Sequence, residues 1–203
     1  MAEVLLFHHA QGLTRGCIGF ADRLRAARHV VHTPDLYEGR VFTELADGIS
    51  YVQEVGFDTI IERGRRAADP LPNEIVYAGF SLGVLPAQML AQTRPGARGA
   101  LLFHSAIPIS EFAVGWPAGV PLQIHMMEGD KEALPPNQDL EVARRMAKTI
   151  NGAELYLYSG DRHLFADDSL PDYDEQSATQ LTKRVLRFLD DLASKPSRRR
   201  SPS

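Results

Sequence analysis

The chain has 203 residues, of which 44% are hydrophobic and 24% charged, and its formal net charge is −4. These values are typical of a globular protein with one sizeable core, and they argue against a fibrous or largely disordered chain. One cysteine rules out an internal disulfide framework. The sequence also has no basic, apolar leader and no segment long enough to span a membrane, so we expect a cytoplasmic protein.

Strand-like and helix-like stretches alternate along the chain, which is typical of a mostly parallel sheet with helices on both faces. The expected strands lie near 3–8, 29–33, 74–78, 99–104, 121–127 and 154–158, and the expected helices near 17–27, 43–67, 82–93, 137–150 and 175–193. No break in composition divides 1–193, which we expect to be a single α/β domain. The remaining segment, 194–203, is rich in Pro, Ser and Arg, and its composition predicts a disordered basic tail.

A Gly-x-Ser-x-Gly motif spans Gly79 to Gly83, directly after the apolar run 74–78 and before an expected helix. Glycines without Cβ atoms let a strand and a helix approach each other across a sharp turn. Such a turn exposes the hydroxyl of Ser81, as in the nucleophile elbow of α/β hydrolases. The motif therefore predicts Ser81 as a nucleophile.

A serine hydroxyl needs a base, and the base needs an orienting acid. In α/β hydrolases the acid and then the histidine follow the nucleophile along the chain, each after a strand. Asp130 follows the expected strand 121–127 and is favoured as the acid, with Glu128 as the alternative. His163 follows the expected strand 154–158, so its position is the one that a base requires.

The chain resembles the dienelactone hydrolase family of the α/β-hydrolase superfamily over nearly its whole length. The resemblance rests on the stretches 7–12, 33–37, 79–83 and 160–173. It implies an α/β-hydrolase fold with about six strands and a minimal cap, and it implies Ser81, Asp130 and His163 as the triad. One departure is clear: better known members have cysteine at the elbow, whereas this chain has Ser81.

The superfamily binds the oxyanion with the backbone N–H after the nucleophile and with a second N–H after the first strand. The first is that of Leu82, and the resemblance implies Ala10 for the second, with Gln11 as the alternative. Four further residues are candidates to line a substrate pocket, with core positions as the alternative for Phe80 and Ile107: His9, Phe80, Ile107 and Trp116.

These residues favour a serine hydrolase that cleaves small esters or lactones through an acyl-enzyme. A thioesterase or amidase could use the same triad, and acyl transfer to an alcohol or amine is a further possibility. A binding protein on the same fold is the non-catalytic alternative.

We expect no cofactor and no metal, because the sequence has no zinc motif. We also expect a monomer or homodimer with no membrane partner. The region before the tail has 18 basic against 26 acidic residues, which disfavours nucleic-acid binding.

Overall fold

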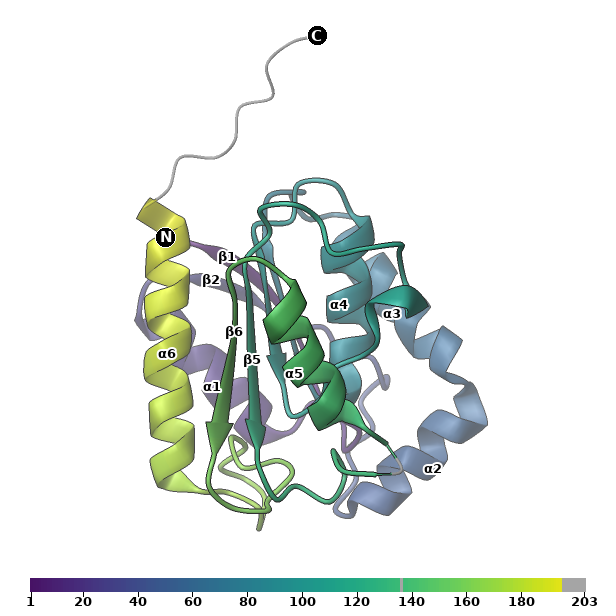
Figure 1. Cartoon of the computed structure of the whole chain (residues 1–203). Helices are drawn as coiled ribbons and strands as arrows, with labels where there is room; N and C mark the ends of the chain where they lie inside the picture. The colour runs from purple at the N-terminus through teal and green to yellow at the C-terminus, as the bar shows by residue number, and fades with distance from the viewer. Residues whose placement is uncertain (136, 195–203) are drawn as a thin grey trace, which may run out of the picture.

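Six strands form one entirely parallel sheet in the order β2-β1-β3-β4-β5-β6 (Figure 1). The computed structural model describes residues 1–135 and 137–194. Its strands are β1 (Glu3–Phe7), β2 (Val30–His32), β3 (Val76–Phe80), β4 (Gly99–Phe103), β5 (Leu122–Met127) and β6 (Ala153–Tyr158). The α/β class and all six expected strands are thus confirmed.

Helices connect the strands and cover both faces of the sheet. They are α1 (Arg15–Ala26), α2 (Leu45–Val55), α3 (Phe57–Ala68), α4 (Val84–Thr93), α5 (Asp139–Thr149) and α6 (Glu175–Ser194). Ser194 is therefore the last residue of a helix, not the first of a tail. The rest of the predicted tail, 195–203, lies outside the described residues.

The side chains of each strand alternate between two hydrophobic cores, as the period of two requires. Leu5 and Phe7 of β1 point to the core formed with α2, α3, α4 and α5. Val4 and Leu6 point to the opposite core, which is formed with α1 and α6. The inner strands are buried on both faces, which is why their sequences are almost continuously apolar.

The single helix expected over 43–67 is wrong, because the structure breaks it at Gly56 into α2 and α3. Gly56 has φ of 87°, in the left-handed region that residues with a Cβ adopt only with strain. The Gly56 N–H donates to the Val52 carbonyl and ends α2, and α3 starts at the next residue. Apolar spacing continues on both sides of the break, so periodicity alone predicted one helix.

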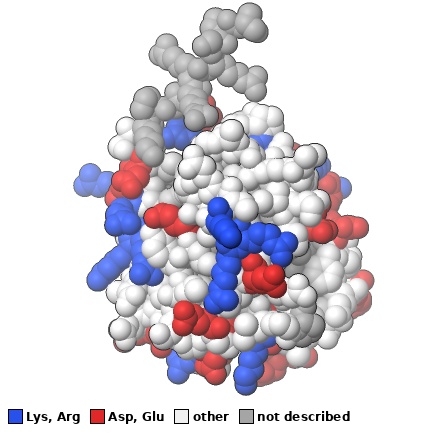
Figure 2. Space-filling model, in the orientation of Figure 1, with Lys and Arg blue, Asp and Glu red and all other residues white. Residues whose placement is uncertain are grey.

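The order of the strands reverses between β1 and β3, and in open α/β sheets ligands bind at the carboxyl ends of the strands beside such a reversal. The candidate residues after β1 and β3 therefore lie next to each other. On the face of the molecule that Figure 2 shows, acidic and basic side chains are interspersed. Within 1–135 and 137–194, no helix has the length and apolar character needed to cross a membrane.

Candidate active site

Ser81 lies on a sharp turn between β3 and α4, as the Gly-x-Ser-x-Gly motif predicts. Its φ is 47°, which is uncommon for any residue other than glycine. The turn is tight enough that a Cβ on Gly79 would lie 2.7 Å from the Val84 nitrogen, and a Cβ on Gly83 would lie 2.6 Å from the His8 carbonyl oxygen. Both glycines are thus required by close backbone approach, and the strained turn presents the serine side chain.

The side chains of Ser81, His163 and Asp130 form one continuous chain of hydrogen bonds. Ser81 Oγ lies 2.8 Å from His163 Nε2, and His163 Nδ1 lies 2.7 Å from Asp130 Oδ2. Asp130 is 1% exposed and His163 is 9% exposed, so little water competes for these bonds. With the proton on Nδ1 donated to the carboxylate, Nε2 is free to accept the serine proton.

The acid and the base meet because β5 and β6 are neighbouring parallel strands whose carboxyl ends lie at the same edge. The two loops are also joined directly, since the Gly129 N–H donates to the Gly160 carbonyl oxygen at 2.8 Å. The second oxygen of Asp130 accepts the Glu132 N–H at 2.9 Å, which fixes the carboxylate. Glu128, the alternative acid, is exposed.

The loop after β1 brings Ala10 next to the elbow. Among the described residues, the Ala10 N–H has no hydrogen-bond partner, whereas the Gln11 N–H donates to His9 Nδ1 at 3.2 Å. The Gln11 side chain is also committed, because its amide donates to the carbonyl oxygens of Phe42 and Thr43. Of the two alternatives for the second oxyanion donor, the structure leaves Ala10 available.

The predicted pocket residues separate into two groups. Phe80 is 2% exposed and packs in the core against Phe20 and Phe103, with ring centroids 5.1 and 4.7 Å away. The Phe80 ring thus lies in the core formed with α1 and α6, and its role in a pocket stays a prediction. Ile107 and Trp116 are half-buried in the loop after β4, and their role in a pocket stays a prediction.

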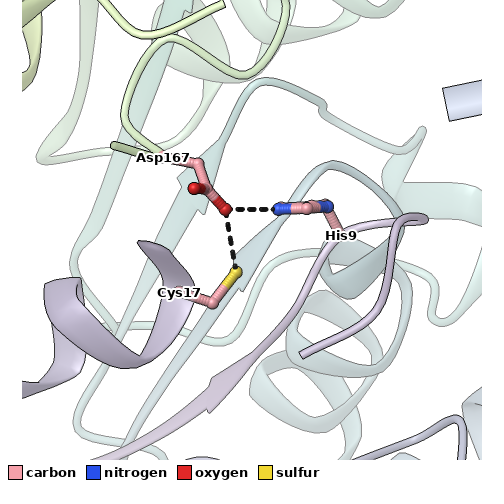
Figure 3. Close-up of side chains that lie close together, drawn as sticks. All are labelled: His9, Cys17 and Asp167. Atoms are coloured by element: carbon pink, nitrogen blue, oxygen red, sulfur yellow. Dashed lines mark hydrogen bonds and ion pairs between the residues drawn. The ribbon is translucent and has the colours of Figure 1, made fainter. Parts of the chain in front are cut away.

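His9, the fourth candidate for the pocket, is completely buried, and its role in a pocket stays a prediction. Its Nε2 lies 2.8 Å from Asp167 Oδ2, and Cys17 Sγ donates to the same oxygen at 3.8 Å (Figure 3). The ligand atoms of these three residues lie within 4.8 Å of one another, as a metal site would need. Two ligands of a tetrahedral zinc ion, bonded at about 2.0–2.2 Å, would lie roughly 3.3–3.5 Å apart. The 2.8 Å separation is instead that of a direct hydrogen bond.

His104 is a residue near the site that the sequence did not single out. It is fully buried at the end of β4, with φ of 69°, and neither ring nitrogen has a hydrogen-bond partner among the described residues. Burial, together with the neighbouring His163, lowers the pKa of His104 well below its ordinary value. A neutral ring therefore packs beside His163, with the ring centroids 6.0 Å apart.

The parallel sheet and the serine on a strained turn after a central strand define an α/β-hydrolase fold. The chain belongs to the dienelactone hydrolase family, whose pattern it matches over residues 1–193. This membership supports a hydrolase that acts on ester bonds. Among curated proteins, no sequence matches this one.

Solved structures with 17–18% identity share the fold. A putative dienelactone hydrolase from Klebsiella pneumoniae is 17% identical, with a TM-score of 0.71 over 96% of this chain and 88% of its own. The dienelactone hydrolase-like promiscuous phosphotriesterase P91 from metagenomic libraries is 17% identical, with a TM-score of 0.72 over 95% and 87%. Esterase 2 of Thermogutta terrifontis, phosphorylated by paraoxon, is 18% identical, with a TM-score of 0.56 over 94% and 82%.

Proposed function

We propose that the protein hydrolyses small esters or lactones through an acyl-enzyme on Ser81. The observation that carries this proposal is the unbroken line of hydrogen bonds from Ser81 through His163 to Asp130. In the first step His163 removes the serine proton and Ser81 attacks the carbonyl carbon, while Asp130 stabilises the imidazolium that forms. The N–H groups of Leu82 and Ala10 hold the developing oxyanion.

The second step uses the same groups. His163 returns its proton to the leaving alcohol and then activates a water molecule, which attacks the acyl carbon and releases the acid. Serine here depends on its histidine more than a cysteine would, since a free cysteine is already partly ionised near neutral pH. We therefore expect no turnover without His163.

Two acidic residues that closely follow the base are bound to other side chains. In the sequence, Asp167 and Asp168 follow His163 closely, and two free carboxylates there would repel an anionic lactone. In the structure both carboxylates face α1, since Asp167 accepts from Cys17 and Asp168 pairs with Arg23 at 3.0 Å. Lactones with a carboxylate therefore belong among the substrates to test.

The test is turnover of p-nitrophenyl esters of graded acyl length, with Ser81→Ala as the matched control. We expect activity on short esters that disappears in Ser81→Ala, and covalent labelling of Ser81 by a fluorophosphonate. Activity on thioesters or amides but on no ester would favour those substrates on the same triad. No turnover and no labelling of the wild-type protein would favour a binding protein instead.

A further inference from the structure

One buried hydrogen bond joins the loop after β1 to the loop after β6. It runs between His9 Nε2 and Asp167 Oδ2 at 2.8 Å, and the residues are 158 positions apart in the sequence (Figure 3). Their exposed fractions are 0% and 4%. His9 directly precedes Ala10, and Asp167 follows His163 by four positions. The bond therefore connects the loop with the proposed oxyanion donor to the loop with the proposed base.

Asp167 is held in place from several sides. Thr14 donates to the oxygen that binds His9, and the backbone and hydroxyl of Ser169 donate to the other oxygen at 2.9 and 2.6 Å. Burial by itself would raise the pKa of Asp167, but the hydrogen bonds from His9, Ser169 and Thr14 lower it below its ordinary range. The group is thus an ionised carboxylate with one well-defined position.

The other nitrogen of His9 acts on the oxyanion loop itself. Nδ1 accepts the Gln11 N–H at 3.2 Å, which orients the peptide plane on the far side of Ala10. Burial favours a neutral His9 ring, whereas the Asp167 carboxylate favours a charged one. A charged ring would carry protons on both nitrogens and would lose the bond from Gln11. Because Nδ1 accepts from Gln11 and Nε2 faces the Asp167 carboxylate, we assign a neutral ring that carries its proton on Nε2.

We propose that His9 and Asp167 are a positioning pair, which holds the Ala10 N–H in register with His163 during the acyl-transfer step. The pair rests on the proposed function, since a register between donor and base matters only if Ser81 reacts. It touches no reacting atom, and it acts through the loop that carries Ala10. An oxyanion donor is used in the transition state rather than for binding substrate, so loss of the pair should lower kcat and leave KM nearly unchanged.

The first test compares His9→Phe, which removes both hydrogen bonds, with His9→Gln, whose amide still offers a donor to Asp167. The concentration of active sites is measured with a fluorophosphonate, so that any misfolded fraction does not count. For His9→Phe we expect kcat to fall about 10- to 100-fold, below the 100- to 1000-fold typical of losing a donor outright. His9→Gln should recover most of this loss, and affinity for a phenylboronic acid, which forms a tetrahedral adduct on the serine, should fall with kcat.

A second variant moves Asp167 without altering either partner, in case His9→Phe fails to fold. In Gly16→Ala the new Cβ would lie 2.9 Å from Asp167 Oδ2 and closer still to the other carboxylate atoms, so the carboxylate must leave His9. Gly19→Ala, one turn later on α1, is the matched control, because its Cβ would lie at an ordinary 3.8 Å from Asp168. We expect Gly16→Ala to lose kcat and Gly19→Ala to retain it.

Three results would overturn the pair. The first is a wild-type kcat per active site in both His9→Phe and Gly16→Ala. The second is a kcat that falls as much in His9→Gln as in His9→Phe. The third is a His9→Phe protein whose whole loss of kcat/KM comes from a higher KM. In each of these cases the wild-type protein still turns over. A wild-type protein that neither turns over nor reacts with a fluorophosphonate refutes the proposed function itself, and the pair with it.

Discussion

Replacing Gly83 with alanine tests whether the elbow needs its close backbone contact. The added Cβ would lie 2.6 Å from the carbonyl oxygens of both Phe7 and His8, and real Cβ atoms essentially never come closer than 3.0 Å to a neighbour. Both obstacles are backbone atoms at the end of β1, so no side chain can rotate to make room. The start of α4 must move away from β1, and Ser81 must move with it.

The magnitude follows from the kind of clash. Overpacking a well-packed site costs typically about 1–3 kcal/mol, and a clash with fixed backbone belongs at the upper end. For a chain of this size, each kcal/mol lowers the melting temperature by roughly 2–4 °C, so we expect a fall of roughly 6–12 °C. A displacement of about 1 Å can cost on the order of 100-fold in rate, so kcat should fall by about 10- to 100-fold.

The assay is thermal unfolding followed by ester turnover, with Gly115→Ala as the control. That glycine lies in an exposed loop, and an added Cβ there would meet nothing within 4 Å. The control should melt within about 2 °C of the wild-type protein, as surface substitutions usually do. A Gly83→Ala protein that melts and reacts like this control would refute the close-approach explanation of the motif.

Three other substitutions or conditions give equally direct expectations. Asp130→Asn should keep the fold but lower kcat by about 10⁴-fold, because the amide favours the wrong tautomer of His163; turnover within tenfold of the wild type would exclude Asp130 as the acid. Gly56→Ala should lower the free energy of unfolding by about 1 kcal/mol or more in urea titrations, since its φ of 87° strains a residue with a Cβ, and no change would contradict that explanation of the break between α2 and α3. Burial lowers the pKa of His8 to about 4 and that of His125 to about 3, from 6.5. As the pH falls through 6.5, these two histidines take up protons in the unfolded chain before they do so in the folded protein. Their contribution to the free energy of unfolding should therefore be at its full value above pH 6.5 and decrease as the pH falls from 6.5 toward 4. A urea midpoint that stays constant between pH 7 and 5 would refute this.

The elbow was predictable because its chemistry is local. The apolar run before Gly79, the paired glycines and the helix after them all lie within a few turns of chain, and the structure has each in place. The positions of Asp130 and His163 were predictable for a different reason. Parallel strands bring their carboxyl ends to one edge, so residues that follow β5 and β6 had to converge with the one that follows β3.

Contacts between distant loops were not predictable in this way. Asp167 belongs to an acidic stretch that reads as the capped start of a helix, and Asp174 does cap α6 by accepting the Ser177 N–H. Asp167 instead points inward to His9, 158 positions away. Neither composition nor periodicity carries information about such a pair. The same limit applies to Phe80. Its position beside Ser81 in the sequence did not indicate on which side of the sheet its ring would lie.

The two ends of the described chain lie at the opposite edge of the sheet from Ser81. Val30 at the start of β2 donates to the Ala2 carbonyl, and the last turn of α6 reaches Gly99 at the start of β4. Figure 1 shows the N-terminus and the end of α6 together, away from the tips of the strand arrows. A twenty-residue helix spans about 30 Å, so α6 carries the chain across the full depth of the molecule. Protein anchored to a bead or sensor near Ala2 or near the end of α6 would therefore present the edge that carries Ser81 to the solution.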